Sequence, residues 1–275
     1  MANSIPLEDT SADIIGKAMR GLNKNAAEVA RLAGVSEAEV SALKDGHFDA
    51  AVVHAVAPVL GLGGEALVLL GEGRWFPKAT QVNGLECFNT PFHDMTVNSY
   101  VAFDRKTGTA VAFDTGADCS EMLTFVEREG LTLELILVTH SHADHILDLA
   151  KLQQVTGAKA YTGRLEPVEG AVPFEAGHAF TCGNLKISSR STWGHSKGGI
   201  SYIIEGLEKP LAVVGDAVFA GSMGGGSVSY ADALRTNRAE LLSLPGETVL
   251  CPGHGPLTTV AEERLHNPFF AVGKQ

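Results

Sequence analysis

The sequence predicts a layered α/β domain preceded by a small all-α domain, and three observations support this. Residues 1–75 are rich in Ala, Val, Leu and Glu at helical spacing and contain little β-pattern. From about Lys78 onward, short β-type runs alternate with helical stretches, and Gly, Asp and Asn separate them. Several of these runs are apolar throughout, which is typical of strands buried on both faces. We therefore expect a helical domain over residues 1–75 and an α/β domain over residues 78–275.

Local signals predict the helices of the first domain. One helix is expected over Asn25–Gly34, which closes on a glycine, and a second over Ser36–Gly46. Ser36 is a good N-cap because a glutamate follows three residues later and completes a capping box. A further helix around Phe48–Leu62, interrupted at Pro58, would cover both.

The two short helices resemble the helix-turn-helix of phage-repressor-like domains, over roughly residues 11–72. The second helix offers Glu37, Glu39 and Ser41, and its one basic residue is Lys44. A helix that reads DNA presents Arg, Asn or Gln at such positions. Residues 1–75 hold six Lys and Arg against ten Asp and Glu. A packing, dimerisation or lid role is therefore favoured over operator binding, and a homodimer through this domain stays open.

Composition and charge narrow the class of protein. The 275 residues are 45% hydrophobic, which allows a sizeable core, and the formal net charge of -11 argues against nucleic acid as the main partner. The N-terminal stretch lacks the basic patch and apolar run of a secretory signal, and no apolar run reaches the length of about 18 residues that a membrane span needs. We expect a cytoplasmic protein without a membrane partner. The four scattered cysteines contain no C-x-x-C pair and predict neither disulfides nor a thiolate zinc site.

The second domain should interleave strands and helices. The candidate strands are Ser99–Phe103, Ala110–Phe113, Leu135–Thr139, Leu185–Ser189, Ile200–Ile204, Leu211–Val214 and Thr248–Cys251. The candidate helices are Cys119–Glu129, Ile146–Gly157, Tyr230–Leu242 and Val260–His266. This alternation favours a layered α/β architecture.

A cluster of histidines directly follows one predicted strand. The segment contains His140, His142, Asp144 and His145, after the apolar run 134–138. If the strand persists to His142, its period of two puts the first two histidines on one side, and the chain turns into a helix at the last two residues. Imidazole and carboxylate suit borderline divalent metals, and two ions side by side would use all four groups.

Three more candidate ligands lie at the ends of later strands. They are His195, Asp216 and His254, and each of them directly follows a glycine. Glycine lets the backbone turn tightly, so that the next side chain points into a common cleft. Repeated placement at strand ends is what an α/β active site needs.

The ordered set H-x-H-x-D-H, G-H, G-D and P-G-H-G-P resembles the metallo-β-lactamase superfamily, and especially its glyoxalase II-like branch, over residues 78–275. The tail 255–268 also resembles the end of single-domain members of that branch. The resemblance implies an αββα sandwich with two divalent metal ions as cofactors. It assigns His140, His142 and His195 to one ion and Asp144, His145 and His254 to the other, with Asp216 bridging them.

The resemblance further implies hydrolysis of a small-molecule thioester, ester or lactone. The two ions, most often zinc with iron or manganese as alternatives, would lower the pKa of a bound water, so that a metal-bound hydroxide attacks a polarised carbonyl. Asp144 and Asp216 would be the catalytic carboxylates. One alternative is a mononuclear iron persulfide dioxygenase that uses His140, His195 and Asp216. Another is a regulatory DNA- or protein-binding module with the larger domain as a sensor.

Three features depart from the glyoxalase II pattern. Glycine stands in the stretch Gly221–Gly226 where an arginine is common, which predicts a more mobile loop and a bulkier or less charged substrate than a glutathione thioester. The helical C-terminal extension that binds glutathione in full-length glyoxalase II is not found after His254, and the extra helices precede the domain instead. Trp193 replaces a frequent proline and is expected either to line the pocket or to pack.

Overall fold

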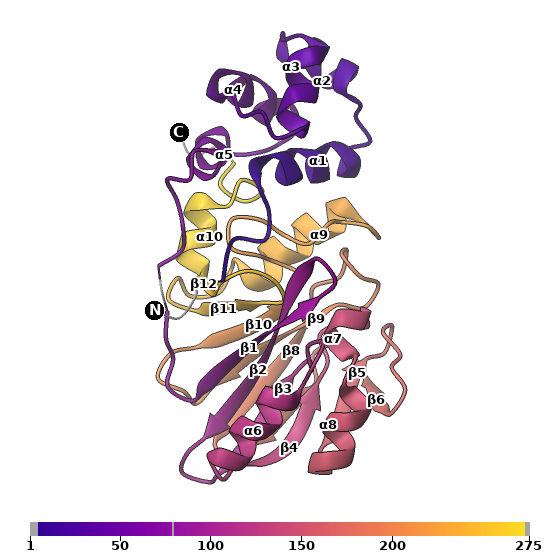
Figure 1. Cartoon of the computed structure of the whole chain (residues 1–275), viewed down its shortest axis with the longest axis vertical. Helices are drawn as coiled ribbons and strands as arrows, with labels where there is room; N and C mark the ends of the chain where they lie inside the picture. The colour runs from indigo at the N-terminus through magenta and orange to yellow at the C-terminus, as the bar shows by residue number, and fades with distance from the viewer. Residues whose placement is uncertain (1–4, 79, 273–275) are drawn as a thin grey trace.

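The computed structural model describes residues 5–78 and 80–272 of the chain. Figure 1 shows the N-terminal helices gathered at one end of the molecule, with two β-sheets and their flanking helices filling the rest. The N-terminal helices are α1 (Ser11–Gly21), α2 (Ala26–Ala33), α3 (Glu37–Lys44), α4 (Ala50–Val59) and α5 (Gly64–Gly71). In the part of the chain so described, no helix is long and apolar enough to cross a membrane.

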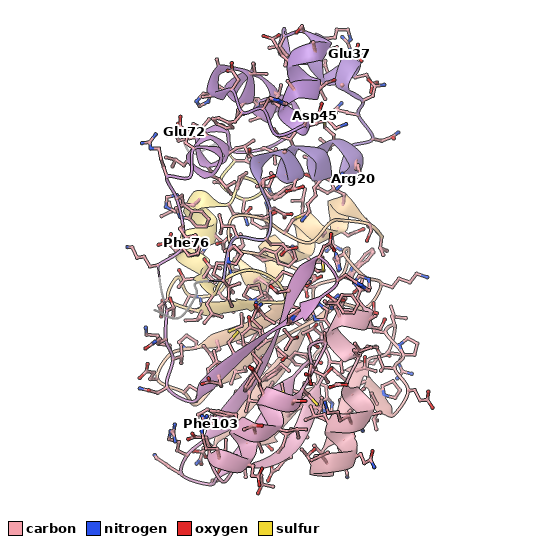
Figure 2. All side chains as sticks on the ribbon, in the orientation of Figure 1. Arg20, Glu37, Asp45, Glu72, Phe76 and Phe103 are labelled. Carbon is pink, nitrogen blue, oxygen red and sulfur yellow. The ribbon has the colours of Figure 1, made fainter. Side chains whose placement is uncertain are left out.

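The first three helices begin in the same way. The N-cap side chains Thr10, Asn25 and Ser36 each accept a hydrogen bond from the backbone three residues on, and the acidic side chain there bonds back to the N-cap. Helix α2 ends at Gly34, whose φ of 72° lies in the left-handed region. The two helices predicted on either side of this glycine are confirmed. The resemblance to a helix-turn-helix domain stays a prediction, and Figure 2 shows Glu37 at the outer end of this region.

Two sheets form the sandwich. Among the described residues, the first has the strand order β1-β2-β3-β4-β5-β6 and the second β12-β11-β10-β9-β8-β7. The first sheet contains β1 (Leu85–Phe92), β2 (Met95–Asp104), β3 (Thr109–Phe113), β4 (Thr132–Leu137), β5 (Lys159–Gly163) and β6 (Ala171–Phe174). The second contains β7 (Ala179–Cys182), β8 (Leu185–Ser191), β9 (Ile200–Glu205), β10 (Leu211–Gly215), β11 (Val249–Pro252) and β12 (Thr258–Thr259). Strands β3 to β6 run parallel, as do β10 and β11, so the carboxyl ends within each parallel set share an edge.

Helices cover both outer faces of the sandwich. The helices of this region are α6 (Ser120–Arg128), α7 (Ala143–Ile146), α8 (Leu149–Thr156), α9 (Tyr230–Thr236) with a π-helical turn over Asn237–Leu241, and α10 (Val260–His266). One apolar core lies between the sheets and includes Phe113 and Tyr202. A second joins Met122 of α6 and other helical residues to the first sheet, and a third joins Val260 of α10 to the second. These layers are the predicted αββα sandwich.

The structure corrects the strand predicted before the histidine cluster. The sequence predicts Leu135–Thr139, whereas β4 ends at Leu137. The Thr139 N–H donates to the Asp114 carboxylate, 2.7 Å away, rather than to a neighbouring strand. The histidines that follow therefore lie on a loop, and strand alternation is not what brings them together.

The apolar core of the helical region continues into the larger region. It contains Ile14 of α1 and Leu67 of α5, but also Met223, Tyr230 and Phe269 from the C-terminal half of the chain. The described helices of the N-terminal region end at residue 71 and the strands begin at residue 85, and the domain boundary between residues 75 and 78 stays a prediction. Because the two regions share one core, the helices pack as part of the same body.

Candidate metal centre

Four loops at one edge of the sandwich bring all seven predicted ligands together. His140 and His142 lie on the loop after β4, and Asp144 and His145 lie on the short helix α7. The other three follow later strands. They are His195 between β8 and β9, Asp216 after β10 and His254 after β11.

The seven side chains form two adjacent groups, within each of which the possible ligand atoms lie within 4.8 Å of one another. In the first group, His142 Nδ1 is 3.0 Å from His140 Nε2 and 3.1 Å from His195 Nε2. In the second, Asp144 Oδ2 is 3.3 Å from His254 Nε2 and 3.5 Å from His145 Nε2. The grouping matches the two ligand sets that the sequence resemblance implies.

Asp216 reaches both groups. Its Oδ2 is 3.3 Å from His195 Nε2, and its Oδ1 is 3.3 Å from His145 Nε2. Among the described residues, Asp216 Oδ1 and His145 Nε2 are buried atoms without a hydrogen-bond partner. Buried polar atoms normally have partners, and imidazole with carboxylate is the ligand set of divalent zinc, iron and manganese. The residues present therefore fit a pair of divalent cations.

The electrostatics of the cluster follow from its burial and its carboxylates. Burial lowers the pKa of His140 well below its usual range. Burial also opposes charge on His145, but the Asp216 and Asp114 carboxylates raise the pKa of His145 to about 10. Burial likewise raises the pKa of Asp216, but the neighbouring His145 and His140 bring it well below its ordinary value. The carboxylates thus stay ionised, and cations can replace the protons that the histidines carry.

Asp114 supports the cluster from behind, and we did not single it out from the sequence. Its Oδ2 accepts hydrogen bonds from His145 Nδ1 and from the Thr139 hydroxyl, both at 2.7 Å. The same hydroxyl lies 3.0 Å from His140 Nδ1. Asp114 also has a φ of 56°, a left-handed conformation that is uncommon outside glycine. It directly follows the predicted strand Ala110–Phe113, which is the signal shared by the later ligands.

Backbone carbonyls and a second carboxylate position the remaining ligands. His254 Nδ1 is 2.7 Å from the Thr96 carbonyl, and His195 Nδ1 is 3.0 Å from the Gly225 carbonyl. Such partners fix the tautomer of a metal-binding histidine and turn its other nitrogen toward the ion. Buried Glu166 accepts from the backbone N–H groups of Ser141 and Gly198, at 3.1 and 2.8 Å. It thereby ties together the two loops that carry the first group.

The glycines before the later ligands are needed for two different reasons. Gly194 and Gly215 have positive φ values of 132° and 49°, as the tight-turn argument predicts. Gly253 is needed for space instead, because a Cβ there would lie 2.2 Å from Asp216 Oδ1 and 2.6 Å from His145 Cε1.

The sequence model of the metallo-beta-lactamase superfamily matches residues 94–254, which is more than half of the chain and includes all seven side chains. The chain belongs to the metallo-β-lactamase superfamily. Within this superfamily, the probable metallo-hydrolase YqgX of Bacillus subtilis is 30% identical over 183 residues, which cover 57% of this chain and 85% of that protein. The hydroxyacylglutathione hydrolase GloC of Haemophilus influenzae is 25% identical over 198 residues, covering 62% and 92%.

Solved structures agree with this metallo-β-lactamase fold. ETHE1 from Myxococcus xanthus is 28% identical with a TM-score of 0.59, covering 68% of this chain and 84% of that chain. TTHA1623 in a di-iron-bound form is 25% identical with a TM-score of 0.55, covering 66% and 99%. The second of these proteins accommodates two metal ions, and they are iron.

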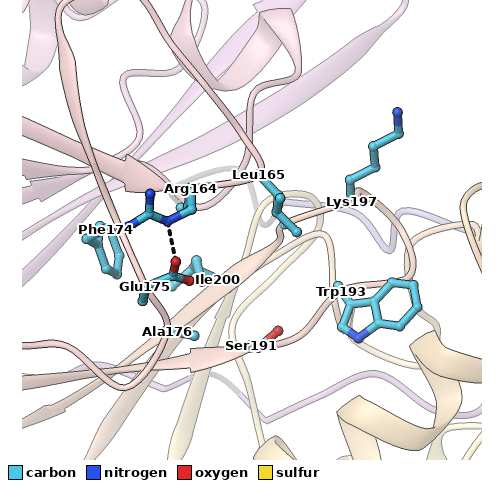
Figure 3. A pocket seen from close by; sticks show the side chains of 11 residues that line it. Arg164, Leu165, Phe174, Glu175, Ala176, Ser191, Trp193, Lys197 and Ile200 are labelled. Atoms are coloured by element: carbon cyan, nitrogen blue, oxygen red, sulfur yellow. Dashed lines mark ion pairs between the residues drawn. The ribbon is translucent and has the colours of Figure 1, made fainter.

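A cavity of about 300 Å³ lies beside the loop that carries His195. Figure 3 shows Trp193 and Lys197 of this loop at one side and the ion pair of Arg164 with Glu175 at the other. Its apolar lining includes Leu165, Phe174, Trp193 and Ile200. Of the two roles expected for Trp193, the structure favours lining a pocket.

Proposed function

We propose that this chain is a dinuclear metallohydrolase that acts on a small thioester, ester or lactone. The observation that carries the proposal is the position of Asp216, whose two carboxylate oxygens face the two groups at 3.3 Å on each side. His140, His142 and His195 would bind one ion and Asp144, His145 and His254 the other, with Asp216 between them. Zinc is the first candidate, with iron or manganese as alternatives.

The chemistry of the reaction would be divided between the ions and the protein groups. When bound, the ions would supply a water acidified toward neutral pH and Lewis-acid polarisation of a carbonyl. Asp144 can accept a hydrogen bond from a water, because hydrogen bonding to His254 keeps its pKa below the ordinary value against the effect of burial. Its side chain is 12% exposed, against 7% for Asp216, so it is the more accessible of the two carboxylates. We assign Asp144 to orienting that water and Asp216 to bridging.

The cavity beside the loop that carries His195 supports a substrate with an apolar acyl group. Its aliphatic and aromatic lining favours burial of such a group, and Lys197 at its mouth would favour a negative charge at the outer end of the substrate. GloC acts on a glutathione thioester by its name. Since glycine occupies the arginine position in this chain, we propose other acyl thioesters and lactones ahead of glutathione thioesters.

Elemental analysis and a substrate panel test this proposal. We expect about two metal ions per chain, and hydrolysis of short acyl thioesters or lactones that is lost on chelation and restored by metal. His47→Ala, an exposed histidine in the helical region, serves as a control that should keep full activity. One iron per chain with oxygen consumption on a persulfide would contradict the hydrolase and support the dioxygenase.

A matched variant tests the cavity. Trp193→Ala should raise KM for an aromatic or branched acyl substrate by about tenfold, because it removes part of an apolar wall. It should leave KM for an acetyl substrate nearly unchanged. Equal effects on both substrates would place the acyl group elsewhere.

A further inference from the structure

We propose that Asp9 and Lys17 of the N-terminal region are positioning residues for the metal centre, acting through the loop Gly221–Gly226. The proposal rests on the metal centre of the proposed function but not on the identity of its substrate. It gives the helical region a role that the sequence left open, because α1 and the segment before it would support His195 and Asp216.

The loop contacts two of the proposed ligands directly. The Gly224 N–H donates to the backbone carbonyl of Asp216 at 3.1 Å, and the Gly225 carbonyl lies 3.0 Å from His195 Nδ1. A Cβ on Gly224 would lie 2.0 Å from that Asp216 carbonyl oxygen and 2.8 Å from His195 Nδ1. The loop thus packs against the ligands without a gap, and a shift of the loop would move His195.

The loop has little stiffness of its own. Its sequence, Gly221-Ser-Met-Gly-Gly-Gly226, contains four glycines, which carry the largest backbone freedom of any residue. The sequence therefore predicted a mobile loop. In the structure its first four residues are buried and hydrogen-bonded instead, so the order must come from contacts outside the loop.

Contacts from the N-terminal region supply part of that order. Lys17 Nζ donates to the Met223 carbonyl at 2.8 Å and pairs with the Asp9 carboxylate. The same carboxylate accepts a hydrogen bond from the Ser222 hydroxyl. The Lys17 and Asp9 side chains are only 13% and 8% exposed, so water competes little with these bonds. Lys17 lies on α1 and Asp9 on the segment just before it, and together they bond the two residues that precede Gly224.

The adjoining segment lies close to the second group as well. Glu8 Oε2 is 4.0 Å from His254 Nδ1, and a Cβ on Gly255 would lie 3.3 Å from the Glu8 backbone nitrogen. The segment from Glu8 to Lys17 therefore lies close to His254 directly, and reaches His195 and Asp216 through the loop. The family match begins only at residue 94, so this support comes from outside the matched span.

The test measures zinc binding to the full chain, with zinc alone as the ligand. In Lys17→Met/Asp9→Asn both charges are replaced together, which avoids leaving one buried charge unpaired. We expect affinity for one of two zinc ions to fall by about tenfold or more, the usual cost of losing a partner behind a ligand. Ser222→Ala should give a smaller loss of the same kind, and Lys17→Arg should retain most of the affinity.

Two controls separate positioning from general destabilisation. Arg74→Met breaks an exposed ion pair with Glu72 in the same region and should change nothing. Val40→Ala removes a buried side chain of α3 that makes none of the hydrogen bonds to the loop, so it should lower the melting temperature while leaving zinc affinity intact. If the double variant binds both zinc ions as tightly as the wild type, or loses no more zinc affinity than Val40→Ala at equal melting temperature, the proposal is wrong.

Discussion

The two halves of the candidate metal centre differ in how they are enclosed. In one half, the side chains of His145 and His254 are 0% and 3% exposed, and a carboxylate and a carbonyl fix their outer nitrogens. In the other half, His142 is exposed and the His195 side chain is 18% exposed. His195 depends on the carbonyl of a glycine-rich loop. We therefore expect the enclosed half to bind its ion more tightly, and the open half to meet the substrate.

Asp216 belongs to both halves, so its loss should have the largest effect. Asp216→Ala should lower the affinity for both ions and reduce kcat by more than about 100-fold, since even partners behind a ligand cost 10–100-fold. Zinc titration and steady-state hydrolysis measure the two effects. Asp118→Ala, at an exposed carboxylate, is the control and should retain both ions. Full zinc binding by Asp216→Ala would show that Asp216 does not bridge the two ions.

Single-histidine variants test the difference between the halves. His142→Ala should lose one zinc ion and keep the other, because its ring contacts only the open half. His145→Ala should lose the tighter ion and also lower the free energy of unfolding, because Asp114 and Asp216 would each lose a buried imidazole partner. Native mass spectrometry counts the ions in each variant. Equal losses in both variants would show that the two halves do not bind independently.

Asp114→Asn tests how the enclosed half is oriented. An amide nitrogen in place of Asp114 Oδ2 would donate toward His145 Nδ1, which would move the His145 proton to Nε2, the atom that faces Asp216. We expect a loss of about 10–100-fold in affinity for the ion of the enclosed half. Asp104→Asn, at a hydrogen-bonded carboxylate on β2, should leave both affinities unchanged. Unchanged affinity in Asp114→Asn would show that this carboxylate does not set the tautomer.

The sequence predicted the ligands better than the groups that support them, and the reason is physical. Each ligand lies on the segment that follows a strand, and His195, Asp216 and His254 each directly follow a glycine, so a local pattern marks them. Asp114 carries the same signal and could have been found. Glu166 could not, because its bonds to Ser141 and Gly198 depend on three loops folding together.

The sequence patterns did not predict two kinds of feature, namely contacts between residues far apart in the chain and a short edge strand. The bond from Lys17 to Met223 joins residues 206 positions apart, and no local signal marks either of them. Strand β6 was not predicted because it is short, exposed and contains Pro173, which is tolerated at a sheet edge. Local patterns thus indicate the secondary structure and the ligands of each segment, whereas the contacts that position those ligands depend on how distant segments pack.

Glu263 offers the mildest test, because it bonds the loop Gly221–Gly226 of the open half at Gly221, whereas Lys17 bonds it at Met223. It accepts hydrogen bonds from the Gly221 N–H at 3.0 Å, from Asn267 and from Thr258, all neutral donors. Burial raises the pKa of Glu263 to about 7. Asp114, behind the enclosed half, bonds a histidine, His145. The open half thus rests on a buried carboxylate with neutral donors, and the enclosed half on one paired with a histidine.

The raised pKa of Glu263 predicts a pH dependence of stability with a definite sign. Between about pH 4.5 and 7 the folded state binds more protons than the unfolded state, so this group's contribution to the free energy of unfolding falls as pH rises, by at most about 1.4 kcal/mol per pH unit. Glu263→Gln can reproduce the protonated form without titrating. Urea unfolding of chelated protein should therefore show that the stability of this variant relative to wild type increases from pH 5 to pH 7.5. A constant difference would mean that Glu263 is already ionised beneath the loop, and the same trend in the exposed control Glu65→Gln would mean that the pH dependence does not come from Glu263.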